Sequence, residues 1–201
     1  LIKNNNGNTI KTSKIHINGT SRVAESISKK DCTHVIIIQG DEPLIQFNHL
    51  NNMVNAIKQN PERDSWNSTC ELNNPESLNE KNVVKASLNF ENRILYCFRK
   101  SPSICKIKDQ LIYIKKIQGL IAFRKEILLK ISSLASSNFE SLESIEQLKI
   151  ISNGFNLYSV AQRNEVPSIN EEKDLNDLYR YLEKNKDEFE ITNQILENKY
   201  L

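Results

Sequence analysis

The sequence predicts an α/β fold in which helices flank a mixed sheet. A continuous β-branched run at residues 34–38 lies between two stretches with helical periodicity, an order typical of α/β sheets. Three strand-like segments follow, separated by Asn, Pro and Ser, so the middle of the sheet is expected to be more antiparallel. Helical patterns return after Arg124.

The first elements surround one buried strand. Residues 20–30 form an amphipathic pattern that predicts a short helix. The run at 34–38 is apolar on both faces, which suits a central parallel strand covered by helices. Gly and Pro end it within Gln39-Gly-Asp-Glu-Pro43, and residues 46–59 then repeat apolar side chains at helical spacing.

The remaining elements alternate between strands and helices. Strands are predicted over 83–88, 93–98, 111–123 and 155–161, with an excursion at 100–110, and helices over 124–134, 140–152 and 174–186. Ser137 and Glu140 form a capping box for the helix at 140–152, and Asn153-Gly154 supplies a left-handed cap at its end.

The bulk properties indicate one domain, residues 1–186, followed by a polar tail, residues 187–201. The 201 residues carry a formal charge of +2 with no basic block, so nucleic acid is not an expected partner. The four cysteines are scattered without zinc-ligand spacing, and no apolar run is long enough to cross a membrane. The opening is polar and unlike a signal peptide, so the expected location is the cytoplasm.

The loop Gln39-Gly-Asp-Glu-Pro43 is the strongest local indication of a site. Ligands of open α/β sheets bind beyond the carboxyl ends of the strands, where Gly40 would allow close backbone approach. Asp41 or Glu42 could hold Mg²⁺, which prefers carboxylate and phosphate oxygens. An ordinary strand-to-helix turn is the alternative, since acids are favoured before helices.

Three other clusters are ambiguous from the residues alone. Gly19-Thr-Ser-Arg22 could bind an anion at a helix start or merely cap the helix. Arg99 and Lys100 could clamp a carboxylate or simply be solvated. Glu140, Glu143 and Glu146 share one helix face, which by itself indicates a solvent-facing surface.

Taken together and in order, these segments resemble the 3-deoxy-manno-octulosonate (Kdo) cytidylyltransferases, or CMP-Kdo synthetases. NGTSRVAE at 18–25 is similar to the family's S-G-T-[DE]-R-[VL]-A-E, and IQGDEPLI at 38–45 to V-Q-G-D-E-P-[LM]-I. Further matches are NVVKAS at 82–87, ILYCFRKSP at 94–102, GLIAFR at 119–124 and SNFESLESIEQLK at 137–149. The resemblance extends from about residue 5 to about residue 184.

The resemblance implies a nucleotide-diphospho-sugar transferase-like (Rossmann-like) mixed sheet with flanking helices, usually in a homodimer. It implies an enzyme that couples CMP from CTP to a 3-deoxy-ulosonate, Kdo or a close relative, and releases pyrophosphate. The product would serve lipopolysaccharide-type glycans, and the implied cofactor is Mg²⁺.

The resemblance also assigns roles to individual residues. Asp41 would be catalytic and hold the metal, and Arg99 would meet the ulosonate carboxylate as a second catalytic residue. Gly19, Thr20 and Arg22 would contact the nucleotide, and Gln39, Glu146 and Gln147 the sugar. Asn170 stands where the family has its second metal carboxylate, so metal binding there is expected to be weaker.

The sequence departs from the family pattern at four places, Asn170 among them. The family's first βα unit, with its basic, glycine-containing triphosphate loop, is missing, so we expect an N-terminally truncated chain that is inactive alone. Ser21 replaces an acid, and the sugar-contacting His expected near Ile117 or Gln118 is absent. Two alternatives remain open: a synthetase for a sialic-acid-like nonulosonate, and a non-catalytic homologue that acts as a binding or assembly subunit.

Overall fold

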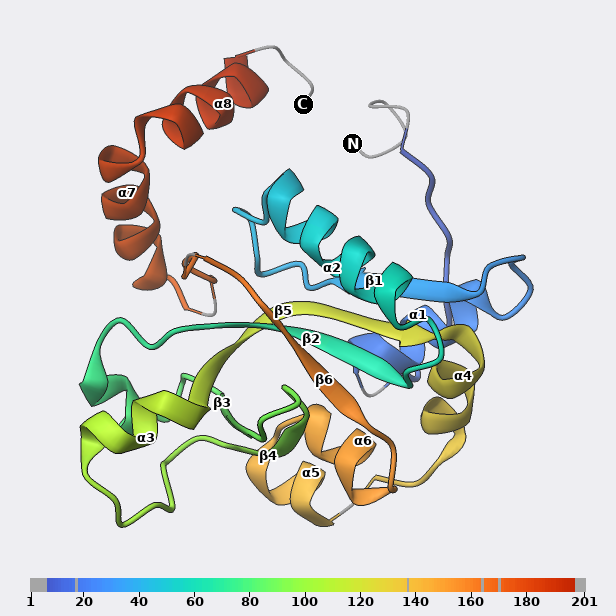
Figure 1. Cartoon of the computed structure of the whole chain (residues 1–201). Helices are drawn as coiled ribbons and strands as arrows, with labels where there is room; N and C mark the ends of the chain where they lie inside the picture. The colour runs from blue at the N-terminus through green and yellow to red at the C-terminus, as the bar shows by residue number, and fades with distance from the viewer. Residues whose placement is uncertain (1–6, 17, 137, 164, 170, 198–201) are drawn as a thin grey trace.

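The described residues form a six-stranded mixed sheet (Figure 1). The computed structural model describes residues 7–16, 18–136, 138–163, 165–169 and 171–197. The long strand β5 pairs antiparallel with β1, β2 and β3; β4 continues the sheet beyond β3, and β6 runs parallel to β2. The strands are β1 (His34–Ile38), β2 (Ser65–Cys70), β3 (Lys85–Leu88), β4 (Ile94–Phe98), β5 (Ile114–Arg124) and β6 (Leu157–Ala161).

Helices cover both faces of this sheet (Figure 1). On one face, α1, α4 and α6 pack against apolar side chains of β1, β4 and β5; on the other, α2 packs against Trp66, Leu120 and Val160. The helices are α1 (Gly19–Ile27), α2 (Phe47–Gln59), α3 (Ile107–Tyr113), α4 (Lys125–Ser133), α5 (Asn138–Glu143), α6 (Gln147–Ser152), α7 (Asp174–Lys184) and α8 (Lys186–Glu197), with a 3₁₀ turn, η2, at Pro75–Asn79.

The predicted α/β class is confirmed, but the prediction for β1 is wrong in one respect. His34–Ile38 pairs with β5 in antiparallel orientation, and within the described part of the chain β5 is the strand that it pairs with. Val35 and Ile37 are buried on one face, and Ile36 packs on the other against the α2 cluster. The apolar run therefore correctly indicated two covered faces, but it carries no information about strand direction.

Residues 111–113, expected to begin the strand predicted over 111–123, belong to the helix α3, and a second region also differs from the prediction. The helix expected over 140–152 is broken into α5 and α6, and Ser144 between them has φ 54°, in the left-handed region that non-glycine residues rarely adopt. The expected left-handed cap is confirmed, since Gly154 has φ 78°. Ser137, the first member of the predicted capping box, lies outside the described residues.

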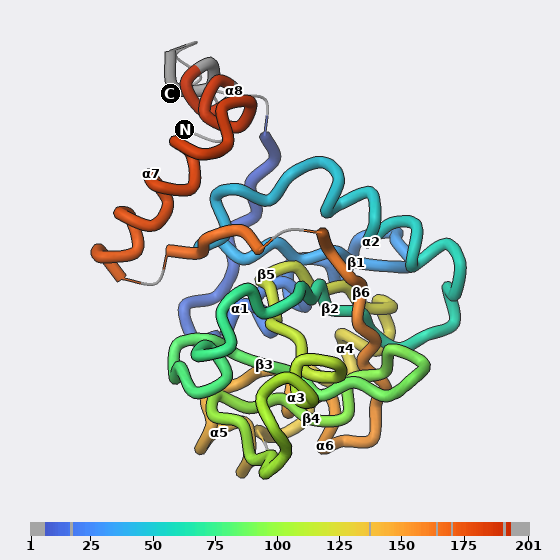
Figure 2. Tube along the Cα trace, turned by 60° about the vertical axis from the view of Figure 1, so that its left-hand side comes forward, coloured from blue at the N-terminus to red at the C-terminus, as the bar shows by residue number. Residues whose placement is uncertain are grey.

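The C-terminal helices extend the fold beyond the sheet. α7 and α8 lie at the opposite end of the molecule from α5 and α6 (Figures 1 and 2). Residues 187–197, expected to be part of a polar tail, belong to α8, and Gln46 before α2 donates a hydrogen bond to Glu188 of α8. A helix both long and apolar enough to cross a membrane is not found in the described ranges.

Candidate active site

A cleft of about 950 Å³ brings together segments that are far apart in the sequence. Its walls come from the loop after β1, the middle of β5, the α5–α6 turn and α7. The predicted site residues Gln39, Asp41, Glu146 and Gln147 all line this cleft. Gly19, Thr20, Arg22 and Arg99 are not among its lining residues in the described part of the chain.

The loop after β1 is fixed against β5 at Gly119. The Gln39 N–H donates to the Gly119 carbonyl at 2.9 Å, and the Gly119 N–H donates to Glu42 Oε1 at 2.8 Å. A Cβ at position 119 would lie 2.5 Å from Glu42 Cγ and 2.8 Å from Gln39 Oε1. Glycine is therefore required here, because the two side chains of the loop occupy the space that a larger residue would fill.

Glu42 contributes a carboxyl group, and one of its two oxygens has no hydrogen bond in the described structure. Its Oε2 is buried and has no hydrogen-bond partner among the described residues. Burial raises the pKa of Glu42, and the charge of Asp41 raises it further, while the Gly119 N–H and Lys116 act in the opposite direction. The loop thus presents to the cleft an acid that holds its proton more tightly than an exposed glutamate.

Asp41 lies beside this acid and is tied to the C-terminal part of the fold. The Ile169 N–H donates to the Asp41 carbonyl at 2.8 Å, so the segment after β6 is bound directly to the loop after β1. Asn170, the second predicted metal residue, lies outside the described residues. In the described ranges, no group of three His, Cys, Asp or Glu residues could hold a metal.

Glu146 joins the predicted sugar-binding and nucleotide-binding segments. Its Oε2 accepts a hydrogen bond from the Thr20 hydroxyl at 2.7 Å, and the Gly19 N–H at the start of α1 also contacts its carboxylate. Burial raises the pKa of Glu146, and the nearby charge of Glu140 adds to the rise, against the bonds from Thr20 and Gly19. The structure thus brings Glu146 to Gly19 and Thr20, although these two residues are not among the lining residues of the cleft in the described structure.

Gln147, next to Glu146, is hydrogen-bonded to a buried residue that the sequence analysis did not indicate. Its Nε2 donates to Oδ1 of Asn67 on β2 at 3.0 Å, inside the fold. Strand β2 itself was not predicted, because Ser65–Cys70 is largely polar and lacks the apolar run typical of a buried strand. Asn67 could have been found only by knowing that this polar strand is buried.

Arg99 donates to three backbone carbonyls, and its role as a clamp for the ulosonate carboxylate stays a prediction. Its Nε donates to the Glu143 carbonyl at 2.9 Å, its Nη2 to the Ser144 carbonyl at 3.0 Å and its Nη1 to the Lys81 carbonyl at 2.8 Å. The guanidinium thus stabilises the strained α5–α6 turn that carries Glu146 and Gln147 into the cleft.

A second cation, Lys85, supports the same region from inside. Its ammonium donates to the carbonyls of Glu80, at 2.7 Å, and of Arg99, and burial lowers its pKa to about 8. Sequence reasoning missed Lys85 as a supporting residue, although it lies within the matched motif at 82–87.

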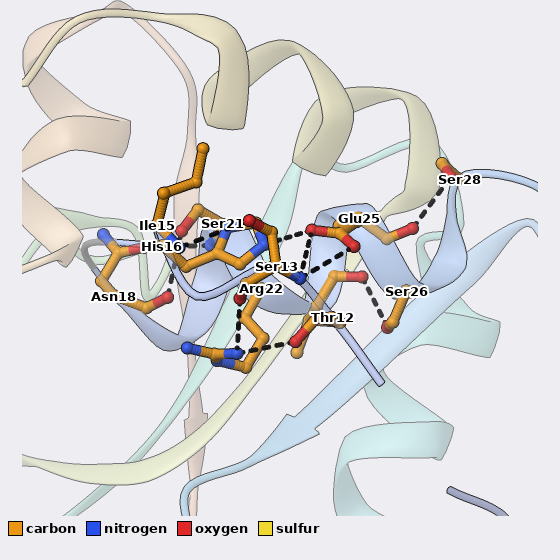
Figure 3. Close-up of polar contacts among 11 residues, drawn as sticks. Thr12, Ser13, Ile15, His16, Asn18, Ser21, Arg22, Glu25, Ser26 and Ser28 are labelled. Carbon is orange, nitrogen blue, oxygen red and sulfur yellow. Dashed lines mark hydrogen bonds and ion pairs between the residues drawn. The ribbon is translucent and has the colours of Figure 1, made fainter. Parts of the chain in front are cut away.

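Arg22 belongs to a separate polar cluster on α1 (Figure 3). Its Nη1 donates to Thr12 Oγ1 at 2.6 Å and to the Ser13 carbonyl at 3.1 Å. Glu25, one turn further along, accepts the Ser13 N–H and contacts the His16 ring. Arg22 and Glu25 therefore hold the segment 12–16 against α1, and neither side chain lines the cleft in the described structure.

Comparison with known proteins gives the family. A family model described as cytidylyltransferase matches residues 1–172. A 3-deoxy-manno-octulosonate cytidylyltransferase from Chlamydia trachomatis serovar A is 30% identical over 179 residues, covering 88% of this chain and 70% of the relative. The enzyme of that name from Fusobacterium nucleatum is 28% identical over 180 residues, covering 89% of this chain and 73% of the relative.

Solved structures confirm the predicted fold. A CMP:2-keto-3-deoxy-manno-octonic acid synthetase complexed with CTP superposes with a TM-score of 0.82 at 23% identity, over 92% of this chain and 76% of that one. A 4-diphosphocytidyl-2C-methyl-D-erythritol synthase from Anaerococcus prevotii gives a TM-score of 0.51 at 12% identity, over 86% of this chain and 68% of that one. The family-model match and the 30% identity across most of a relative show that the chain belongs to the 3-deoxy-manno-octulosonate cytidylyltransferase family.

Proposed function

We propose that the protein transfers CMP from CTP to Kdo, or to a close 3-deoxy-ulosonate relative, and releases pyrophosphate. The observation that carries the proposal is the shared cleft. Gln39 and Asp41 on one loop and Glu146 and Gln147 on a distant turn line the same 950 Å³ space. The product would supply glycans of the lipopolysaccharide type.

The chemistry of the cleft suits a polyhydroxylated acceptor. Asp41, Glu42 and Glu146 offer carboxyl oxygens, and Gln147 adds an amide. Sugar hydroxyls can donate hydrogen bonds to such groups. A ligand that lacked the matching hydroxyl would leave a buried acceptor unpaired, and this gives strong discrimination between sugars.

The residues of the loop after β1 fit the implied Mg²⁺ in part. Asp41 would hold the ion, because its carboxylate lies at the cleft beside Glu42, whose Oε2 is buried without a partner in the described structure. Mg²⁺ commonly binds through one or two carboxylates and completes its shell with phosphates and water. When bound, it would neutralise charge on the triphosphate.

The reaction is one in-line displacement at the α-phosphorus of CTP. The anomeric oxygen of the sugar acid forms a bond to phosphorus, the bond to pyrophosphate breaks, and the hydroxyl proton is lost to solvent or a nearby base. The chain's part is to position the sugar and to offset charge. Cations for the phosphates would come in part from α7 and the residue before it, where Lys173, Arg180 and Lys184 line the cleft.

The test is pyrophosphate release from CTP and Kdo by the full-length protein. We expect release that depends on Kdo, CTP and Mg²⁺ together. N-acetylneuraminate in place of Kdo serves as the matched acceptor control and should give little product. Turnover with N-acetylneuraminate but not with Kdo would assign the protein to another sugar, and CTP binding without turnover of either acid would indicate a non-catalytic homologue.

The proposal includes a homodimer in the cytoplasm. Large apolar side chains that a second copy could cover are exposed around α3 and the β3–β4 turn, namely Phe90, Ile104 and Ile112. Light scattering after size-exclusion chromatography should give twice the chain mass. A monomer at micromolar concentration would exclude a stable dimer, and fractionation of the source cells would test the compartment.

A further inference from the structure

A fully buried amide lies directly beneath the cleft. Asn67, on β2, is 0% exposed. Its Nδ2 donates to the Gln118 carbonyl at 2.9 Å and to the Ser68 carbonyl at 2.9 Å. Carbonyl oxygens only accept hydrogen bonds, so the NH₂ side of the Asn67 amide must face these two groups. Its Oδ1 is therefore fixed in the other direction, toward Gln147.

This arrangement fixes the orientation of a second amide. Oδ1 of Asn67 can only accept, so Gln147 must turn its own NH₂ group inward, and its Nε2 lies 3.0 Å from Asn67 Oδ1. Gln147 is 8% exposed and lines the cleft. Its Oε1 is the polar atom that remains for a ligand, and it takes part in no hydrogen bond within the described structure.

We infer that Asn67 is a positioning residue that sets which atom of Gln147 the sugar acid meets. Through two fixed amides, the strand β2 makes Gln147 a hydrogen-bond acceptor at the cleft. The ligand group at this point is therefore a donor, a sugar hydroxyl rather than a carboxylate or carbonyl oxygen. The inference rests on the proposed function. It adds that the site accepts, rather than donates, a hydrogen bond where the sugar acid meets Gln147.

Two substitutions separate this role from simple packing. Asn67→Leu keeps the approximate size of the side chain but gives Gln147 no partner, so both orientations of its amide become available. Asn67→Asp also loses the amide donor, yet it keeps an acceptor oxygen facing Gln147 Nε2. A purely structural role predicts that both variants behave alike, whereas the positioning role predicts that they differ in sugar selectivity.

The kinetic experiment compares Kdo with a set of monodeoxy Kdo analogues. In the parent, one analogue should lose about tenfold in kcat/KM, because the hydroxyl that donates to Gln147 is missing. In Asn67→Leu this loss should shrink to about twofold, with the KM for CTP unchanged, while Asn67→Asp keeps most of it. Equal discrimination in the parent and in Asn67→Leu would overturn the inference, and so would equal behaviour of the two variants.

A second measurement does not depend on turnover or on a stable variant. In the parent protein labelled with ¹⁵N, the side-chain NH₂ protons of Gln147 should exchange at least tenfold more slowly than those of Gln59, which is exposed at the end of α2. Exchange as fast as that of Gln59 would overturn the positioning of Gln147. Slow exchange in a protein that shows no turnover of Kdo would uphold the amide arrangement and refute the proposed function alone.

Discussion

The backbone N–H of Ile169 donates to the carbonyl of Asp41 at 2.8 Å. This bond joins the segment after β6 to the loop after β1, two regions widely separated in the chain. Asn170, the next residue in the sequence, lies outside the described residues. The loop that carries Asp41, a predicted metal residue, is therefore tied to the described segment that ends at Ile169.

Asn170→Asp is expected to lower the Mg²⁺ concentration that gives the half-maximal rate, by about three- to tenfold. Asparagine can coordinate Mg²⁺ through its amide oxygen but brings no negative charge to a hard dication. The melting temperature without metal should change little, since Asn and Asp are similar in shape. The measurement is a Mg²⁺ titration of pyrophosphate release.

A matched control is Asn176→Asp, which adds the same charge at an exposed position on α7. It should leave the Mg²⁺ requirement unchanged. The same shift in both variants would mean that general charge, and not the position of residue 170, affects the metal. An unchanged requirement in Asn170→Asp would place another carboxylate in that role.

Asp41→Asn is expected to reduce turnover by at least about a hundredfold while the fold is retained. Asp41 lines the cleft, and the bond that ties it to Ile169 uses its backbone, which the substitution leaves in place. Pyrophosphate release should fall, and the melting temperature without Mg²⁺ should stay within a few degrees. Turnover within a few-fold of the parent would direct attention to Glu42.

Helices with one buried face were predictable, because burial of that face requires apolar residues at helical spacing in the sequence. Residues 47–59 repeat apolar side chains at helical spacing, and the structure forms α2 there. The direction of β1 was not predictable, because an apolar run reports covered faces and not a partner strand. The polar strand β2 was missed for the opposite reason, since its burial is supported by hydrogen bonds such as those of Asn67.

The site was predictable to the extent that a motif fixes the position of a residue. Gln39, Asp41, Glu146 and Gln147, to which the resemblance gives roles, line one cleft, and the roles themselves stay predictions. The break at Ser144 could not be foreseen, because Ser is not a residue that favours the left-handed region. Arg99 donates hydrogen bonds to the carbonyls at that break, so these contacts could not be predicted from the sequence either.

Gly119→Ala is expected to destabilise the protein by about 1–3 kcal/mol and to reduce turnover. The added Cβ would meet Glu42 Cγ at 2.5 Å and Gln39 Oε1 at 2.8 Å, so both side chains must leave β5. Gly40→Ala is the control for stability, because a Cβ there meets nothing within 4 Å. Urea unfolding of both variants tests this, and equal stabilities would show that the loop moves without cost.

Glu42→Gln is expected to become more stable relative to the parent as the pH rises. Burial raises the pKa of Glu42 in the folded state, so the folded protein binds that proton more tightly than the unfolded chain does. The stabilisation is complete below the unfolded pKa of about 4.3 and is lost as the pH rises through the raised folded value. Glutamine does not ionise and avoids this loss.

Melting temperatures from about pH 4 to about pH 8, without Mg²⁺ or CTP, measure the difference. The advantage of Glu42→Gln over the parent should grow across this range. Glu183→Gln, at an exposed position on α7, should show no such trend. A constant difference between Glu42→Gln and the parent would mean that Glu42 ionises equally easily in both states.

Arg99→Lys is expected to destabilise the protein by about 1–3 kcal/mol even without ligand. Arg99 donates from three nitrogens to the carbonyls of Lys81, Glu143 and Ser144, and a single ammonium on a flexible stem cannot reproduce this planar arrangement.

The matched control for Arg99→Lys is Arg93→Lys, because Arg93 uses its guanidinium for one side-chain hydrogen bond in the described structure, to Asn156. Its cost should stay below about 0.5 kcal/mol. Urea unfolding without substrate measures both variants. The KM for Kdo should also rise in Arg99→Lys, because the turn at Ser144 carries Glu146 and Gln147 to the cleft. Unchanged ligand-free stability together with a raised KM for Kdo would contradict the turn-holding role and restore Arg99 as a direct contact of the ulosonate carboxylate.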